Sequence, residues 1–408
     1  MRTTKYLLIG GGLASSQAAK ILAAKDPGAP VTLVCGEPHL PYDRPPLSKE
    51  FLRGEKTRDE LTYDPASFFH ENNIAVLLGE SVVKLDPNAK TATLESGETI
   101  HFEKALIATG GAPIRLTLPG SSLEGIHYLR RVDDALAIRA EAAPGKRAVV
   151  VGAGFIGMEL AASLTRLGAR VTVIEALPQI WARFLDATLA AHIRSYYEKK
   201  GISFLTGESV REFKGDTRVR KVVTNSGREI ECDVVCVGVG IRPEVGIAQE
   251  AGLAVQNGIV VNERLQTSHP DIFAAGDAAN YPDPIFGKRR RVEHWGFAEY
   301  TGQVAGLNMA GVEQTYDLLS YAWSDIFDLH IEFAGDDSEH DRVLVRGTLD
   351  AASFTVLYLK NDVLRAYFAV NTDSREFPAL QKLIRQKTPL GGREAELRNP
   401  DFELNGLA

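Results

Sequence analysis

The sequence predicts an α/β protein in which two Rossmann-like nucleotide-binding domains are followed by a small α+β domain. A glycine-rich motif that joins an apolar strand to a helix occurs twice, beginning at Gly10 and at Gly152. Each helix leads to a second apolar run and then to an acid, Glu37 in the first unit and Glu175 in the second. From about residue 316 the pattern changes to antiparallel strands. Two βαβ units and a different tail indicate three domains.

The composition is typical of a globular protein and excludes several classes of function. The 408 residues, 44% hydrophobic and 24% charged, suffice for two or three cores. A net charge of −7 argues against nucleic acid as the main partner. No apolar run approaches the roughly 18 residues that span a bilayer, so no membrane is expected. The three cysteines suit a reducing compartment, and a strand that starts near Lys5 leaves no room for a signal peptide. We therefore expect a cytoplasmic protein.

The first motif has glycines at the two positions that a dinucleotide site requires. Gly10 permits a tight turn from strand to helix, and Gly12 lets a pyrophosphate approach the backbone. Ser15 takes the third position, where helix–sheet packing needs only a small residue. Glu37 lies where an acid would bind ribose hydroxyls. The start of the helix would offer backbone N–H groups to the phosphates from Leu13, Ala14 and Ser15.

The second motif predicts an NAD site. Its members are Gly152, Gly154, Phe155, Ile156 and Gly157. Glu175 follows the second strand, and a carboxylate there accepts hydrogen bonds from a free 2′-hydroxyl and repels a 2′-phosphate. Arg183 is close enough in sequence to bind such a phosphate, so NADPH stays open as an alternative.

Later segments complete the predicted domains. Three apolar runs that end in glycine turns are expected to be buried strands: 104–110, 233–240 and 271–277. In the tail, the pattern predicts strands at 343–349, 354–359 and 363–370, a turn at 361–362 and a helix at 376–386. We expect a first nucleotide domain in two parts, 1–110 and 241–315, a second nucleotide domain over 111–240, and a C-terminal domain over 316–408.

Four stretches carry a resemblance to a known family: 41–49 (PYDRPPLSK), 108–110 (ATG), 154–159 (GFIGME) and 274–277 (AAGD). On these residues the chain resembles the FAD-dependent pyridine-nucleotide reductases of the glutathione-reductase superfamily. Within that superfamily it is most similar to the ferredoxin reductases of bacterial oxygenase systems, of the biphenyl dioxygenase reductase and putidaredoxin reductase type. The resemblance implies a glutathione-reductase-like fold, with FAD on the first nucleotide domain, NAD on the second and a C-terminal domain that helps to cover the flavin.

The resemblance also implies roles for individual residues. Asp277, after Gly276, would hydrogen-bond FAD between its ribityl chain and pyrophosphate, although a helix N-cap is compatible with the same position. Lys49 would lie near the flavin N5 edge and pair with Glu159, and a plain interdomain salt bridge is the alternative. The other implied cofactor contacts are Arg44, Val82, Ala108, Thr109, Gly110, Arg130, Gly240, Trp295 and Trp323.

For two of these residues, Arg130 and Trp323, an ordinary structural role is an alternative to cofactor binding. Arg130 would serve equally as a solvated arginine. A single tryptophan is more often part of a core, so the role of Trp323 as an aromatic face against the flavin depends on the resemblance.

The cysteines decide the subclass. Disulfide reductases and single-cysteine oxidases of this superfamily carry a cysteine after the first motif, and the stretch 41–54 contains none. Cys232 and Cys236 are expected on one strand, roughly 13 Å apart along an extended chain, which is too far for a disulfide. We expect both, and Cys35 at the end of a strand, to be packing residues. No spacing typical of zinc or an iron–sulfur cluster is present.

One basic cluster, Lys288-Arg289-Arg290-Arg291, stands out on an acidic protein. It could steer an acidic iron–sulfur partner, or it could be an ordinary solvated loop.

These features predict an NADH-dependent flavoprotein reductase. Hydride would pass from NADH to FAD, and electrons would leave singly to a small [2Fe–2S] ferredoxin, with rubredoxin as a variant. Alternatives with the same fold use dioxygen, a quinone or monodehydroascorbate as acceptor. A different class, the apoptosis-inducing-factor-like proteins, uses NADH binding to control association with other proteins.

Overall fold

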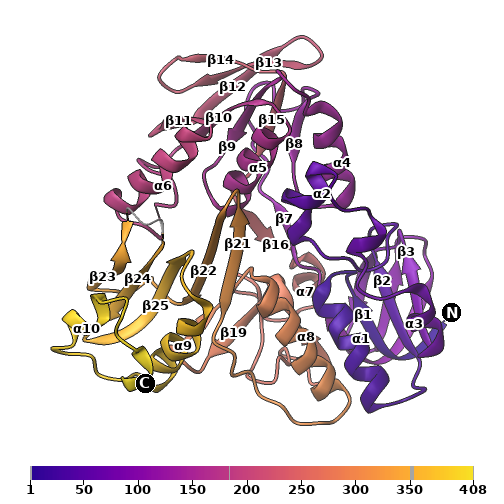
Figure 1. Cartoon of the computed structure of the whole chain (residues 1–408). Helices are drawn as coiled ribbons and strands as arrows, with labels where there is room; N and C mark the ends of the chain where they lie inside the picture. The colour runs from indigo at the N-terminus through magenta and orange to yellow at the C-terminus, as the bar shows by residue number, and fades with distance from the viewer. Residues whose placement is uncertain (1, 183, 350–352, 408) are drawn as a thin grey trace. The chain divides into compact units, whose positions relative to one another are not determined.

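The chain forms two compact units, each assembled from segments that are distant in the sequence (Figure 1). This computed structural model describes residues 2–182, 184–349 and 353–407, so the predicted site residue Arg183 lies outside the described residues. The first unit comprises Met1–Asp43, Asp59–Ala112 and Arg242–Ala322. The second comprises Arg44–Arg58, Pro113–Ile241 and Trp323–Ala408.

The first unit is built on a largely parallel sheet. Its strands are β1 (Arg2–Ile9), β2 (Val31–Cys35), β3 (Ile74–Leu78), β4 (Val82–Asp86), β5 (Thr91–Leu94), β6 (Thr99–Ile107) and β18 (Ile272–Ala274). The order is β3-β2-β1-β6-β5-β4, and β18 also pairs with β6. β1, β2, β3, β6 and β18 run parallel, so the turns that follow them meet at one edge of the sheet.

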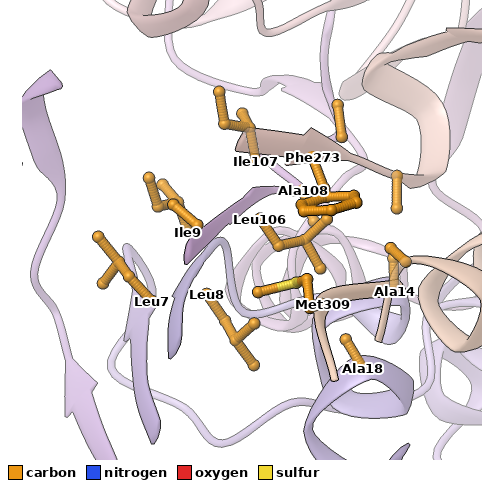
Figure 2. Close-up of a cluster of buried hydrophobic side chains, with 14 of the residues drawn as sticks. Leu7, Leu8, Ile9, Ala14, Ala18, Leu106, Ile107, Ala108, Phe273 and Met309 are labelled. Carbon is orange, nitrogen blue, oxygen red and sulfur yellow. The ribbon is translucent and has the colours of Figure 1, made fainter. Parts of the chain in front are cut away.

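Helices α1 (Leu13–Lys25) and α8 (Trp295–Met309) pack closely against each other in this unit. The contact depends on glycines: a Cβ at Gly302 would lie 2.3 Å from the Ala14 carbonyl oxygen. Figure 2 shows the buried core that forms between these helices and the sheet, with Leu7 and Leu106 from the strands and Met309 from α8. The late segments of the chain are therefore integral to the first nucleotide fold.

Smaller elements complete the first unit. They are α3 (Ala66–Glu71), α7 (Gly246–Glu250), the 3-10 turns Asp59–Leu61 and Gly276–Ala278, and a small sheet of β17 (Ile259–Val260), β19 (Ala279–Asp283) and β20 (Lys288–Arg290). The chain passes between the units in β7 (Gly111–Pro113) and β16 (Ile241–Pro243).

The second unit contains a five-stranded parallel sheet. Its strands are β8 (Ile126–Tyr128), β9 (Arg147–Val151), β10 (Arg170–Glu175), β11 (Ser203–Thr206) and β15 (Val234–Val237), in the order β11-β10-β9-β15-β8. The helices are α2 (Glu50–Arg53), which follows a 3-10 turn at Pro45–Ser48, then α4 (Val132–Glu141), α5 (Phe155–Arg166) and α6 (Ala187–Lys199). An antiparallel sheet of β12 (Val210–Gly215), β13 (Val219–Thr224) and β14 (Glu229–Glu231) is appended.

The C-terminal residues form an antiparallel sheet with two helices. The sheet has the order β21-β22-β25-β24-β23, made of β21 (Tyr321–Ile326), β22 (Leu329–Gly335), β23 (Arg342–Thr348), β24 (Ser353–Lys360) and β25 (Val363–Val370). Asn361 and Asp362, predicted as a turn, have φ of 49° and 63°, as a tight hairpin requires. Helices α9 (Phe377–Gln386) and α10 (Glu394–Arg398) and 3-10 turns at Ser374–Glu376 and Leu404–Gly406 follow.

The predicted fold class is confirmed, and two local expectations differ from the structure. Cys232 precedes β15 instead of lying on it, so of these two cysteines only Cys236 is a strand residue. The segment Arg44–Arg58 groups with the second unit although it lies within the expected first nucleotide domain. The reason is apolar packing, because fully buried Leu52 joins the core that includes Ile138 and Met158. Within the described residues, no helix combines the length and the apolar character that crossing a membrane requires.

Candidate nucleotide-binding sites

The first glycine turn follows β1 and has a shape suited to a pyrophosphate. Gly10 has a φ of +116°, and a Cβ there would lie 2.3 Å from the Ala108 carbonyl oxygen, so only glycine fits. At Gly12, by contrast, a Cβ would meet nothing within 4 Å. Gly12 is the N-cap of α1 and no side chain caps the helix, so its first N–H groups face this open space. These features fit a bound dinucleotide phosphate.

Several predicted FAD residues of the first unit lie around this turn. Ser15 is fully buried, and its hydroxyl has no hydrogen-bond partner among the described residues. Glu37 accepts a hydrogen bond from the Tyr42 hydroxyl at 2.5 Å. The Gly79 N–H donates to the Glu37 carbonyl, so the chain leading to Val82 at the start of β4 runs beside the Glu37 loop.

Asp277 is brought next to the helix that follows the glycine turn. It lies inside the 3-10 turn Gly276–Ala278, and a Cβ at Gly276 would lie 3.4 Å from the Ala14 Cβ. The N-cap of that turn is Ala275 and no side chain caps it, so the alternative of an N-cap role for Asp277 is wrong. On the neighbouring strand end, the Thr109 hydroxyl donates to the Glu244 carbonyl at 2.5 Å.

Trp295 begins helix α8 and is only half-buried. Its indole N–H donates to the Asp43 carboxylate at 2.9 Å and to the Tyr63 hydroxyl at 3.2 Å. Sequence reasoning missed both partners, although Asp43 lies within the family-like stretch 41–49. The indole is fixed by polar contacts, which distinguishes Trp295 from an ordinary core tryptophan.

The second glycine turn, after β9, repeats this design with one difference. Gly152 has a φ of +101°, and a Cβ at Gly154 would meet nothing within 4 Å. Gly154 is the N-cap of α5, again without a capping side chain. A Cβ at Gly157 would lie 2.0 Å from the Gly152 carbonyl oxygen, so this position tolerates only glycine, whereas the first motif accommodates Ser15. The helix therefore approaches its turn more closely in the second unit.

Glu175 is held in place at the end of β10. Its carboxylate accepts hydrogen bonds from the Ala153 N–H at 2.6 Å and the Leu177 N–H at 2.8 Å. A carboxylate has about four acceptor sites, so further sites stay available for ribose hydroxyls. Gly240, with a φ of +106°, ends the turn after β15.

An aromatic cluster that the sequence did not predict lies against this second turn. Trp181 is 3% exposed, and its ring centroid lies 5.3 Å from that of Phe155 and 5.9 Å from that of Phe368 in β25. Its indole N–H has no partner among the described residues. The only sequence feature that could have indicated a role for Trp181 is its position shortly after Glu175. The cluster joins the glycine turn to the C-terminal sheet within the second unit.

Lys49 and Glu159 form a buried ion pair in the second unit, and the predicted pairing is confirmed. The Lys49 Nζ lies 2.9 Å from Glu159 Oε1, and the two residues are 8% and 5% exposed. The Glu159 carboxylate also accepts hydrogen bonds from the hydroxyls of Ser48 and Ser324. Sequence reasoning missed both serines. The placement of Lys49 beside a flavin stays a prediction.

The remaining predicted FAD contacts of the second unit are Arg44, Arg130 and Trp323. Arg44 Nη1 donates to the Arg130 carbonyl oxygen at 2.5 Å, and the Arg130 N–H donates to Asp134 at 2.9 Å. The backbone at Arg130 is therefore fixed from both sides. Trp323, in β21, is 36% exposed.

The basic cluster is not a freely projecting patch. Arg290 pairs with the buried Asp283 at 3.0 Å, and Arg291 pairs with Glu293 at 2.7 Å. Arg289 donates to the Asn280 carbonyl oxygen at 2.8 Å. These contacts fix the arginines against neighbouring segments of the first unit, and a docking role for the cluster stays a prediction.

The cysteines are the packing residues that the sequence predicted. Cys35, Cys232 and Cys236 are free thiols and are all 0% exposed. Burial raises the pKa of each thiol to about 12. No group of His, Cys, Asp or Glu able to hold a metal occurs in the part of the chain that is described.

Comparisons with known proteins agree with this arrangement. A family model described as "Pyridine nucleotide-disulphide oxidoreductase" matches residues 4–302, and one described as "Reductase C-terminal" matches residues 321–408. Rhodocoxin reductase of Rhodococcus erythropolis is 33% identical over 98% of this chain and 93% of its own. The 5,5'-dehydrodivanillate O-demethylase ferredoxin reductase subunit of a Sphingobium species is 36% identical over 90% of this chain and 89% of its own. The crystal structure of the ferredoxin reductase for the CYP199A2 system from Rhodopseudomonas palustris matches with a TM-score of 0.93 and 31% identity over 100% of both chains.

Proposed function

The chain belongs to the pyridine nucleotide-disulphide oxidoreductase family, and on that premise we propose that it passes electrons from NADH through FAD to a small iron–sulfur protein that serves an oxygenase. It is an FAD-dependent NAD(P)H oxidoreductase of the ferredoxin reductase type. The proposed partner is a [2Fe–2S] ferredoxin, with rubredoxin as the variant. Both relatives and the solved structure above carry reductase names, and two of them name a ferredoxin reductase.

The proposal depends on two glycine turns that could each hold a dinucleotide, in a chain whose thiols are all buried and cannot form a redox-active disulfide. Gly12 and Gly154 each leave open space at an uncapped helix start, which supports two dinucleotides. All three cysteines are free and fully buried, so none can relay electrons as a disulfide. A flavin without a disulfide relay suits a one-electron acceptor.

When bound, FAD supplies a two-electron acceptor for hydride and a one-electron donor for the partner. The protein residues bind and orient the two nucleotides. The uncapped N–H groups of α1 and α5 hold the phosphates, and Glu37 and Glu175 hold the ribose hydroxyls. Asp277 would hydrogen-bond the FAD chain near its pyrophosphate. Lys49, fixed by its ion pair with Glu159, would place its ammonium group at the flavin edge. Orientation accounts for most of the rate enhancement.

NADH is the proposed donor, because the Glu175 carboxylate is already fixed by two backbone N–H groups and would repel a 2′-phosphate. We place the enzyme in the cytoplasm, where a reducing environment suits three free thiols.

An anaerobic titration with NADH tests the proposal directly. The purified protein should be yellow and should bleach rapidly, and cytochrome c reduction should depend on an added ferredoxin. Equal turnover with dioxygen alone would identify an oxidase instead. A colourless protein that takes up no FAD would contradict the assignment.

A further inference from the structure

Glu159, on helix α5, is contacted by three side chains from two different parts of the second unit, the segment 48–49 and strand β21. Ser48 donates to Oε2, and Ser324 donates to Oε1 at 2.5 Å. Lys49 Nζ lies 2.9 Å from the same Oε1. Ser48, Ser324 and Glu159 are 2%, 1% and 5% exposed, so these contacts are formed away from water. Hydrogen bonds to a buried charged group are among the stronger ones in a protein.

Ser324 comes from the C-terminal sheet, where it is next to Trp323 in strand β21. Successive side chains of a strand point to opposite faces. The burial along β21 follows this rule, because Trp323 and Asp325 are exposed whereas Ser324 and Ile326 are buried. A hydrogen bond that fixes the Ser324 side chain on one face therefore also fixes the direction of Trp323 on the other.

We propose that Ser324 is a positioning residue: its hydrogen bond to Glu159 holds strand β21 against helix α5 and so fixes Trp323. This inference rests on the proposed function only for the flavin contact of Trp323. Glu159 then acts as a common anchor. It holds Lys49 by an ion pair and Trp323 through Ser324, so two residues expected at the flavin have their positions set by one carboxylate.

The first test measures the strand itself and needs no turnover. Amide hydrogen exchange is followed in peptides that cover β21, using the FAD-loaded protein without NADH. Ser324→Ala should accelerate exchange there by about 10-fold or more, because the strand loses a hydrogen bond to a charged group. Ser324→Thr keeps the hydroxyl and should retain slow exchange.

Thr355→Val is the matched control. It removes another buried hydroxyl from the C-terminal sheet, one that lies 2.9 Å from the Thr372 hydroxyl and is 1% exposed. Exchange in β21 should stay as in the unaltered protein. Unchanged exchange in Ser324→Ala, or an equal acceleration in Thr355→Val, would overturn the proposal. If Ser324→Thr does not fold, Ser324→Cys supplies the conservative comparison.

The second test asks whether the hydroxyl acts through Trp323. A tryptophan in contact with a flavin quenches its fluorescence, so Trp323→Phe should raise flavin emission, and Ser324→Ala should raise it as well. On the Trp323→Phe background, Ser324→Ala should add nothing. Additive increases would overturn the proposed route. A protein that NADH does not reduce would disprove the proposed function, and the exchange test of Ser324 would still give its answer.

Discussion

Lys49 Nζ lies 2.9 Å from Glu159 Oε1, and water reaches little of either side chain. Separating two such charges leaves one of them buried without its counter-ion, which is far more costly than losing an exposed salt bridge. Removing only one partner should therefore destabilise the fold, apart from any effect at the flavin.

Replacing Lys49 tests that statement. Lys49→Met should lower the free energy of unfolding by about 3 kcal/mol, because the two serine hydroxyls only partly compensate the Glu159 charge. Urea unfolding gives the value. The double variant Lys49→Met/Glu159→Gln should recover most of the stability while reduction of the flavin by NADH stays slow. If the double variant is as unstable as the single one, the buried charge is not the cause.

Adding a single methyl group at Gly12 or Gly154 should show which nucleotide each glycine turn binds. Gly12→Ala should leave the melting temperature of the FAD-free protein nearly unchanged but weaken FAD binding, because the new Cβ enters open space that a phosphate would fill. Gly154→Ala should spare FAD and weaken NADH binding for the same reason. FAD retention and NADH titration measure the two effects.

Gly10→Ala is the contrasting variant. Its Cβ would lie 2.3 Å from a carbonyl oxygen and its φ is +116°, so it should destabilise the fold itself. Loss of FAD without loss of stability in Gly10→Ala would contradict this distinction between the two glycines.

Glu175 should determine the preference for NADH. Glu175→Ala removes an acceptor of ribose hydroxyls, and the affinity for NADH should fall about 10-fold or more. The affinity for NADPH should fall less, or rise, because repulsion of the 2′-phosphate is relieved as well. Isothermal titration of the oxidised protein with NAD⁺ and NADP⁺ separates the two. An unchanged affinity for NAD⁺, which shares the ribose hydroxyls of NADH, would show that the assignment of Glu175 is wrong.

His294 should make stability depend on pH. Burial, together with a smaller contribution from the nearby Arg290 guanidinium, lowers its pKa from 6.5 to about 4. Between these pH values the unfolded chain binds a proton that the folded chain does not, so acidification across this window favours unfolding. The loss amounts to at most about 3 kcal/mol.

Urea unfolding at pH 7 and at pH 4.5 measures this effect. His294→Gln should lose less stability on acidification than the unaltered protein, whereas His70→Gln, at an exposed position of the same unit, should behave like the unaltered protein. An identical loss in His294→Gln would contradict the assignment to His294.

The local chain pattern was sufficient to predict the nucleotide-binding architecture. The apolar strands, the glycines and the acids lie close together in sequence. As predicted, a helix follows each glycine motif (α1 and α5), and the next strand (β2 or β10) leads to the acid. The turn at Asn361 and Asp362 was equally local.

The contacts that the sequence did not predict are long-range. Ser324 reaches Glu159 across 165 residues, and nothing near either residue indicates the other. Trp181 lies between the second glycine turn and the C-terminal sheet, where its ring contacts Phe155 on one side and the sequence-distant Phe368 on the other. The ion pairs of the basic cluster are local by contrast, because Arg290 pairs with Asp283 and Arg291 with Glu293, and closeness in sequence could have indicated both.

The close packing of α1 on α8 at Gly302 sets the order in which the chain can fold during synthesis. The first helix leaves the ribosome long before the helix that covers it. Ala112 ends the N-terminal part of the first unit. At roughly 5–20 residues per second, synthesis from Ala112 to Gly302 on α8 takes on the order of 10–40 s. Throughout that time the apolar face beneath α8 has no native cover, so the nascent chain offers a binding site to chaperones until the late segment arrives.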